Sequence, residues 1–173
     1  NYAEKYKFLE KCGFEGVELS GGALMDPAKF KEIKAALKGS RLKPSVICGG
    51  VTWSSLHPAP KDRQKSWDEA VAVIEKGAEV GCPRLIFVPI FGGPQISDLS
   101  PWKNAWDLER SILVEALCRV AVRLEKIPGA RLILEPLNRY ETHFLNRLEQ
   151  AEPIVEEVGS KAIKIMGDFF HMN

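Results

Sequence analysis

The sequence of 173 residues has few cysteines, little net charge and no long apolar run. Its four cysteines, Cys12, Cys48, Cys82 and Cys118, are widely spaced and form no C-x-x-C pair. This spacing argues against a zinc knuckle or a disulfide framework, so we expect the cysteines to be small buried side chains. A net charge of +1 gives no electrostatic reason to expect nucleic acid or an anionic membrane surface as a partner.

Membrane, export and phosphate-binding signals are also missing. No apolar run approaches the roughly 18 residues that cross a bilayer. The stretch from residue 1 to 14 is a charged amphipathic pattern without the apolar core of a signal peptide. No predicted strand is followed by G-x-G-x-x-G or G-x-x-x-x-G-K-[ST], the loops that cradle phosphates. We therefore expect a cytoplasmic protein with no membrane partner and no nucleic-acid partner.

What the sequence does contain is one unit that occurs five times. A helical pattern ends near a glycine, a few residues follow, and a short apolar strand leads into a glycine-rich or acidic loop. We expect each of these glycines to end its helix in the left-handed conformation. They are Gly13, Gly39, Gly81, Gly129 and Gly159. Alternating helices and strands with short links predict a parallel sheet.

Apolar residues at helical spacing predict the helices between these strands. The predicted helices cover residues 2–12, 27–38, 61–80, 106–124 and 148–158. Asp26 as the N-cap and Pro27 at the first helical position mark the start of the second helix. The apolar stripes of these helices are interpreted as core, with one face against the sheet.

Polar and glycine residues gather where the predicted strands end. They are Glu18, Gly49–Gly50, Gly92–Gly93, Glu135 and Asp168. Barrel enzymes build their sites from the ends of several strands, so we favour a (β/α)8 TIM barrel over an open doubly wound sheet. A complete barrel needs about 250 residues, and only about five βα units are visible. Residues 1–173 are therefore interpreted as one partial barrel domain that begins on a helix and stops just after a strand.

The most informative stretch is RLILEPLNRYETHFLN, residues 131–146. Leu132 to Leu134 predict a short strand buried on both faces, and Pro136 stops the ladder just after Glu135. A carboxylate at this position is costly unless it has a partner. Glu135 can therefore be a salt-bridged structural residue, a metal ligand or a general base.

Other side chains leave alternatives open. His57, in a loop with prolines, is expected to be a loop residue rather than a ligand, whereas His143 fits either role equally. Trp102 and Trp106 could line an apolar wall of a site or pack an entering helix. Arg139 could pair within its own motif or with a neighbouring loop.

Three motifs resemble the ketose 3-epimerase (D-tagatose/D-psicose 3-epimerase) family, which belongs to the xylose isomerase-like TIM barrels. They are EPLNRYETHFLN at 135–146, GDFFHMN at 167–173 and GFEGVEL at 13–19. The resemblance runs from the first helix through the sixth strand of such a barrel. It implies a metal-dependent sugar epimerase that interconverts ketoses at C3 through an enediolate.

The resemblance also implies roles for four residues. Glu135 would be the first metal ligand and the acid/base, and Asp168 the second ligand. Glu141 and His171 would contact the sugar near its C1 to C3 oxygens. The family's other ligands, a His and a second Glu, have no counterpart up to Asn173.

The expected cofactor is a divalent metal, with Mn²⁺ preferred over Mg²⁺ or Co²⁺, because oxygen-rich ligands suit these ions. The expected partners are a small sugar substrate and further copies of the chain in a homo-oligomer. Three other functions stay open: a sugar isomerase or keto-polyol dehydratase on the same barrel, a catalytically incomplete barrel fragment, and an endonuclease IV-like DNA repair enzyme. The last is least favoured, because its trinuclear zinc site needs several His ligands and this sequence has three His in all.

Overall fold

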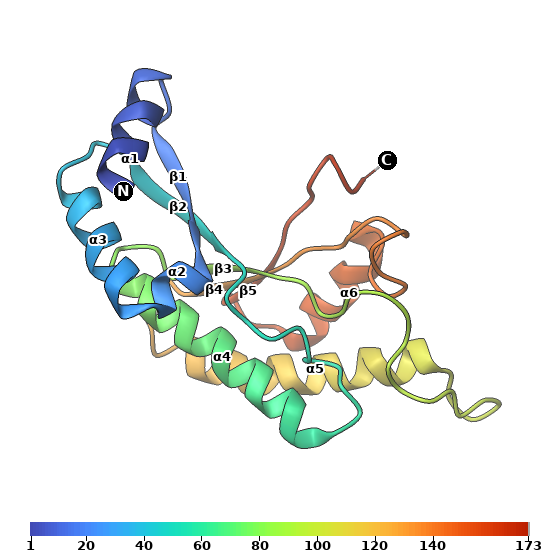
Figure 1. The fold of residues 1–173 in the computed structure, drawn as a ribbon. Coiled ribbons are helices and arrows are strands. Elements are labelled where there is room, and N and C mark those ends of the chain that lie inside the picture. Colours follow the sequence, from blue (N-terminus) through green and yellow to red (C-terminus); the bar gives the residue numbers. More distant parts are fainter. Residues whose placement is uncertain (173) are drawn as a thin grey trace.

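The computed structural model describes residues 1–172 and contains a single parallel sheet flanked by helices (Figure 1). The strands follow chain order, β1-β2-β3-β4-β5, and every neighbouring pair is parallel. Their bounds are Gly16–Ser20, Lys43–Cys48, Arg84–Phe87, Arg131–Leu134 and Ile163–Ile165. Sequential parallel strands joined by helices form the wall of a βα barrel, which confirms the predicted fold class.

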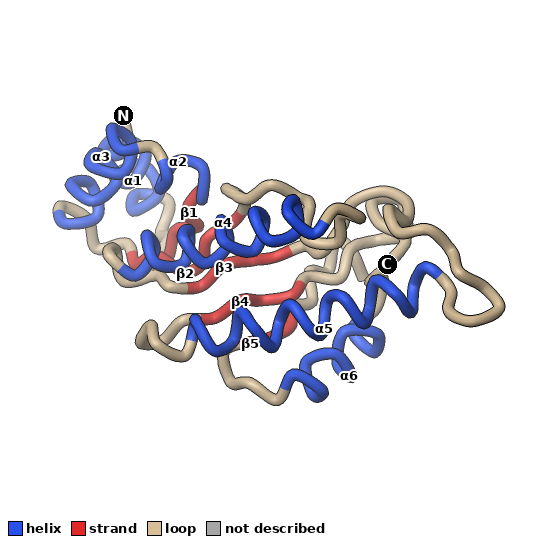
Figure 2. Tube along the Cα trace, turned by 90° about the horizontal axis from the view of Figure 1, so that it is seen from below, coloured by secondary structure: helices blue, strands red, loops and turns tan. Residues whose placement is uncertain are grey.

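Six helices occur within the described residues. Helices α1 to α6 span Tyr2–Lys11, Gly21–Met25, Pro27–Lys38, Pro60–Ala78, Ala105–Leu124 and Leu148–Val158. The five predicted helices are confirmed, and α2 was not predicted because five residues are too few to show a helical period. Figures 1 and 2 show α4, α5 and α6 on the same side of the sheet.

The predicted start of α3 is confirmed in atomic detail. Asp26 Oδ1 accepts hydrogen bonds from the backbone N–H groups of Ala28 at 2.9 Å and Lys29 at 3.1 Å. These bonds satisfy two of the donors that a helix start leaves without partners. Pro27 occupies the first helical position, where a missing N–H costs nothing.

Four of the five predicted helix-ending glycines have positive φ, and Gly39 does not. Gly39 ends α3 with φ −95°, and its N–H bonds to the carbonyl of Ala36 at 3.2 Å. A tighter last turn of this kind satisfies the helix end without a left-handed residue. The prediction of a left-handed Gly39 is therefore wrong.

The strand before Glu135 is buried on one face only. Leu132 and Leu134 are 0% exposed and belong to the main core, whereas Ile133 is only half-buried. The prediction of burial on both faces is thus wrong at Ile133. Because side chains alternate along a strand, Glu135 continues on the side of Ile133, away from the core.

The cysteines also differ from expectation. Only Cys82 is buried, whereas Cys12, Cys48 and Cys118 are exposed, so the prediction of buried thiols is wrong for three of the four. Cys12 caps the end of α1 and Cys118 lies on the outer face of α5. Within residues 1–172, none of the helices combines the length and apolar character needed to cross a membrane.

Candidate active site

Glu135 and Asp168 follow two neighbouring parallel strands. Strand β4 pairs with β5 up to Leu134 and Ile165. Backbone pairing then continues past both strands, because Met166 N–H bonds to the Leu134 carbonyl at 2.8 Å. Both carboxylates therefore lie at the C-terminal ends of the strands, as the sequence predicted.

All four predicted site residues lie close together at the C-terminal ends of the strands. One carboxylate oxygen of Glu135, one of Asp168 and one ring nitrogen of His171 lie within 4.8 Å of one another. His171 Nε2 is 3.9 Å from Glu135 Oε1, and His171 Nδ1 is 3.7 Å from Glu141 Oε1. We call Glu135, Asp168, Glu141 and His171 the acidic cluster.

A turn that begins at Asp168 brings His171 back toward Glu135 at the C-terminal ends of the strands. Asp168 Oδ1 accepts a hydrogen bond from Phe170 N–H at 2.8 Å, and its backbone carbonyl accepts from His171 N–H at 2.9 Å. A side chain that bonds to the backbone two residues ahead is the usual way in which Asp starts a turn. Asn173, the last residue of the motif GDFFHMN, lies outside the described residues.

Asn138 links the cluster together, and sequence reasoning missed it. Its backbone N–H and its side-chain Nδ2 lie 3.3 and 3.0 Å from His171 Nδ1, and Nδ2 also lies 2.8 Å from Glu141 Oε1. Because the backbone N–H can only donate, His171 Nδ1 accepts and Nε2 carries the hydrogen. The available signal was an Asn in a turn sequence three residues before Glu141.

The environment of Glu135 is poor in water and rich in negative charge. Its side chain is nearly buried, and this burial raises the pKa of the carboxyl. His171 acts against the rise, whereas other carboxylates add to it, namely Asp168, Glu18 and Glu141. A divalent cation would relieve this repulsion, and carboxylate oxygens are the ligands that hard cations prefer. The donor set therefore fits a divalent metal.

Cys48 extends the same environment to the end of β2. Although the Cys48 residue is exposed, neighbouring atoms partly desolvate its thiol and raise the pKa, and the carboxylates of Glu18 and Glu135 raise it further. Glu18 belongs to β1 and Glu135 follows β4, so the charges of these two carboxylates act on a thiol at the end of a third strand. Glu18, one of the polar residues expected where the strands end, is thus an electrostatic neighbour of Glu135.

We expect the Cys48 thiol of the metal-free protein to react with iodoacetamide at a higher pH than an ordinary thiol, whose pKa is about 8.5. Only the thiolate reacts, and partial desolvation together with two nearby carboxylates disfavours it. Glu18→Gln should move the midpoint of the rate profile to lower pH, because one negative charge is removed. Mass spectrometry of the modified peptide measures the rate, with Glu4→Gln as control. An unchanged midpoint in Glu18→Gln would show that the charge of Glu18 does not act on the Cys48 thiol.

The remaining candidates lie outside the acidic cluster. His57 accepts a hydrogen bond from Ala59 N–H at 3.2 Å, which confirms a loop role. Trp106 Nε1 donates to the Phe144 carbonyl at 2.9 Å and so packs its helix, whereas Trp102 is 76% exposed.

Arg139 and His143 also contact residues outside the acidic cluster. Arg139 lies over the ring of Tyr140, 5.2 Å from its centroid, rather than against Glu141. His143 pairs with Glu109, 2.6 Å from His143 Nε2 to Glu109 Oε2. Neither residue therefore joins the candidate metal ligands found among residues 1–172.

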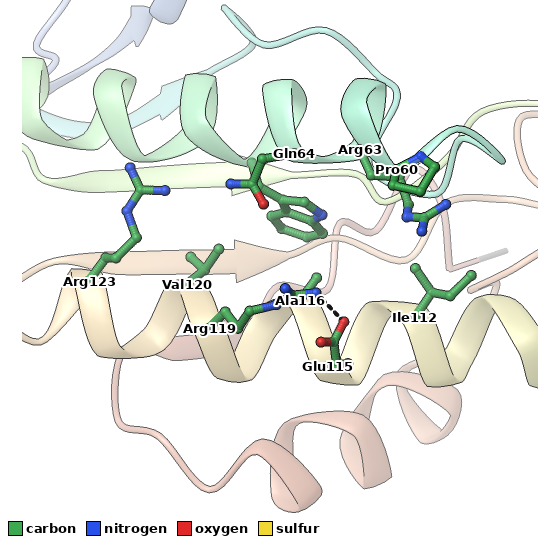
Figure 3. A pocket seen from close by; sticks show the side chains of 10 residues that line it. Pro60, Arg63, Gln64, Ile112, Glu115, Ala116, Arg119, Val120 and Arg123 are labelled. Carbon is green, nitrogen blue, oxygen red and sulfur yellow. Dashed lines mark hydrogen bonds and ion pairs between the residues drawn. The ribbon is translucent and has the colours of Figure 1, made fainter.

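A cavity of about 280 Å³ lies elsewhere, between α4 and α5 (Figure 3). Its arginines already have partners: Arg119 pairs with Glu115, and Arg63 donates to the carbonyls of His57 and Pro58 at 2.7 and 2.8 Å. None of the residues that line it belongs to the acidic cluster. The chemistry of the described chain therefore concentrates at the strand ends, not in this cavity.

Parallel strands with helices between them, and an acidic cluster where the strands end, define a βα-barrel protein with a candidate site at the strand ends. Residues 6–173 match the family model described as xylose isomerase-like TIM barrel. The chain belongs to this family, as its motifs predicted.

Relatives of the chain are named as sugar epimerases. The 3-dehydro-D-guloside 4-epimerase of Escherichia coli K12 is 31% identical over 175 residues, which cover 100% of this chain and 65% of that protein. The D-psicose 3-epimerase of Ruminiclostridium cellulolyticum is 26% identical, over 99% of this chain and 57% of that protein. The crystal structure of 3-keto-D-glucoside 4-epimerase from E. coli superimposes with a TM-score of 0.82 at 30% identity, covering 100% of this chain and 65% of that one. The chain thus spans 65% or less of the length of these three relatives.

Proposed function

We propose that this protein is a metal-dependent epimerase that inverts a carbon next to the ketone of a sugar. The observation that carries the proposal is the convergence of Glu135, Asp168 and His171, whose candidate ligand atoms lie within 4.8 Å of one another at the strand ends. Removal of a proton beside a ketone gives an enediolate, and a site for this reaction needs a base and a means to offset negative charge.

Each residue of the acidic cluster has a task that suits its surroundings. Glu135 takes the proton from one face of the carbon, because a carboxyl whose pKa is raised by burial is a stronger base. Inversion then needs an acid on the opposite face to return a proton, and the resemblance gives this role to the family's second Glu, which has no counterpart among residues 1–173. His171 donates from Nε2 to a sugar oxygen, since its Nδ1 accepts from Asn138. Glu141, which Asn138 also holds, accepts from a sugar hydroxyl.

Glu135 and Asp168 would hold the divalent metal, with Mn²⁺ preferred and Mg²⁺ or Co²⁺ as alternatives. When bound, such an ion supplies Lewis-acid stabilisation of negative charge on the sugar oxygens. Asp168, which follows the neighbouring strand β5, would supply the second carboxylate ligand. The Nε2–H tautomer of His171 favours a hydrogen-bonding role for this residue over a third ligand.

Two substrate classes fit the site. The first is a free ketose epimerised at C3, which the three sequence motifs favour. The second is a 3-dehydroglycoside epimerised at C4, which is favoured by 31% identity over the whole chain to an enzyme of that name. The reacting carbon is next to a ketone in both, so the same residues can serve either.

Deuterium incorporation separates these possibilities. The natural full-length protein is incubated with Mn²⁺ in D₂O and supplied with D-fructose or with a 3-dehydroglucoside. We expect epimerisation of one of them, with deuterium at C3 of the ketose or at C4 of the glycoside. Label only at C1 or C2 of an aldose–ketose pair would favour an isomerase, and loss of water would favour a dehydratase. Absence of exchange into every sugar would contradict the proposal.

Assembly and location stay predictions. We propose a homo-oligomer in the cytoplasm, with a sugar as the small-molecule partner.

A further inference from the structure

A pair formed by the half-buried His143 and the buried Glu109 joins two loops beside the acidic cluster. Glu109 lies in α5 and is 0% exposed. Its Oε2 lies 2.6 Å from His143 Nε2, and its Oε1 accepts a hydrogen bond from the backbone N–H of Gln95 at 3.1 Å. A buried carboxylate is tolerated only when it is bonded in this way, so its two partners are held firmly.

Both ring nitrogens of His143 are engaged. Nδ1 lies 3.0 Å from the carbonyl oxygen of Gly92, and a carbonyl can only accept, so Nδ1 carries a hydrogen. Nε2 faces the Glu109 carboxylate at the short distance of a charge-assisted hydrogen bond. Both ring nitrogens of His143 therefore bond to Gly92 and Glu109, and the ring cannot also bind a metal or a sugar.

Gly92, which contacts His143 Nδ1, is also hydrogen-bonded to the backbone of Glu141. The Gly92 N–H donates to the carbonyl of Glu141 at 2.7 Å, and the Gly92 carbonyl accepts from His143 N–H at 3.0 Å. These bonds form a parallel bridge between Gly92 and Thr142, outside the named strands. The backbone of Glu141 is thus fixed by the same glycine that His143 Nδ1 holds.

The Glu141 side chain connects the bridge between Gly92 and Thr142 to the other residues of the acidic cluster. Its Oε1 accepts from Asn138 Nδ2 at 2.8 Å and lies 3.7 Å from His171 Nδ1. His171 in turn lies 3.9 Å from Glu135. A shift of the loop after β4 would therefore move Glu141 relative to the base.

We propose that the His143–Glu109 pair is a positioning device that holds Glu141 at the sugar. Neither residue touches the reacting carbon; they act by locking the loops after β3 and β4 together. This inference rests on the proposed function, in which Glu141 binds a sugar oxygen.

The first test is a double-mutant cycle on the natural full-length protein with Mn²⁺. His143→Ala should lower kcat/KM by about 100-fold, the loss expected when a binding group is misplaced by about 1 Å. In a Glu141→Gln background the same change should have little further effect, because its action passes through Glu141. Mn²⁺ affinity should be unchanged, since the pair contacts neither Glu135 nor Asp168. Additive losses would overturn the proposal.

Conservative variants separate geometry from charge. In Glu109→Gln the amide oxygen can still accept from Gln95, and its NH₂ can donate to a neutral His143 ring. This variant should keep kcat/KM within about threefold, whereas Glu109→Ala should resemble His143→Ala. Arg110→Ala is the matched control, because Arg110 is the next residue of α5 and pairs with Glu157, outside both loops. Equal losses in Glu109→Gln and Glu109→Ala would contradict a role in geometry.

Hydrogen exchange tests the same device without turnover. Mass spectrometry should show faster amide exchange in residues 138–143 of His143→Ala, with residues 131–134 unchanged. If the wild-type protein acts on no sugar, the proposed function fails, while exchange still tests the link between the loops. Unchanged exchange in residues 138–143 would overturn the link itself.

Discussion

Glu135→Gln is expected to lower kcat for sugar epimerisation by a factor of about 10² to 10⁴, the usual contribution of a general acid/base. Gln has nearly the same shape but cannot accept or return a proton. Glu135 is nearly buried, which restricts the access of a replacement base from solvent to the same carbon. Steady-state kinetics and loss of deuterium incorporation from D₂O measure the effect.

A matched control separates this effect from a general loss of charge. Glu152→Gln makes the same chemical change on the exposed face of α6 and should keep the wild-type kcat. Thermal unfolding of both variants checks that the fold is kept. Turnover that persists in Glu135→Gln would remove this residue as the acid/base and direct attention to another carboxylate of the cluster.

Asp168→Asn is expected to weaken Mn²⁺ binding by more than the 10- to 100-fold loss that is typical of residues outside the ligand sphere. The substitution removes a charged ligand, yet Asn Oδ1 can still accept from Phe170 N–H and keep the turn. Glu135→Gln should weaken binding similarly, because both carboxylates belong to the same candidate ligand group. Isothermal titration calorimetry of the natural full-length protein measures the affinity.

Asp62→Asn serves as the control for Mn²⁺ binding. It removes the same charge from an exposed residue at the start of α4, outside the candidate ligand group. Its Mn²⁺ affinity should equal that of the wild type. Equal affinity in Asp168→Asn as well would contradict the assignment of Asp168 as a ligand.

The alternation of helices and strands was readable from the sequence because its causes are local. Helical spacing of apolar residues reports which face is buried, and caps such as Asp26 report where a helix begins. The position of Glu135 at a strand end followed from Pro136, which cannot extend the ladder. Once the strands are parallel and adjacent, Asp168 must come near Glu135, so this part of the site was also predictable.

The motifs EPLNRYETHFLN and GDFFHMN also pointed to Glu141 and His171, and the structure brings both to Glu135. The sequence could not say what holds them there. Asn138 bridges Glu141 and His171 only because the turn after Asp168 folds back over the loop after β4. That contact depends on the register of two strands, which local patterns do not encode.

The sequence by itself determined the barrel class, the helix starts and the acidic residues at the strand ends, because each depends on neighbours within a few positions of the chain. Only the tertiary structure decided that His143 pairs with Glu109 instead of joining the metal ligands. It also decided that Ile133 lies on the face of β4 opposite the main core and that the charge of Glu18 acts on the Cys48 thiol. These outcomes depend on which elements pack together and in what register, and burial then sets the cost of each charge.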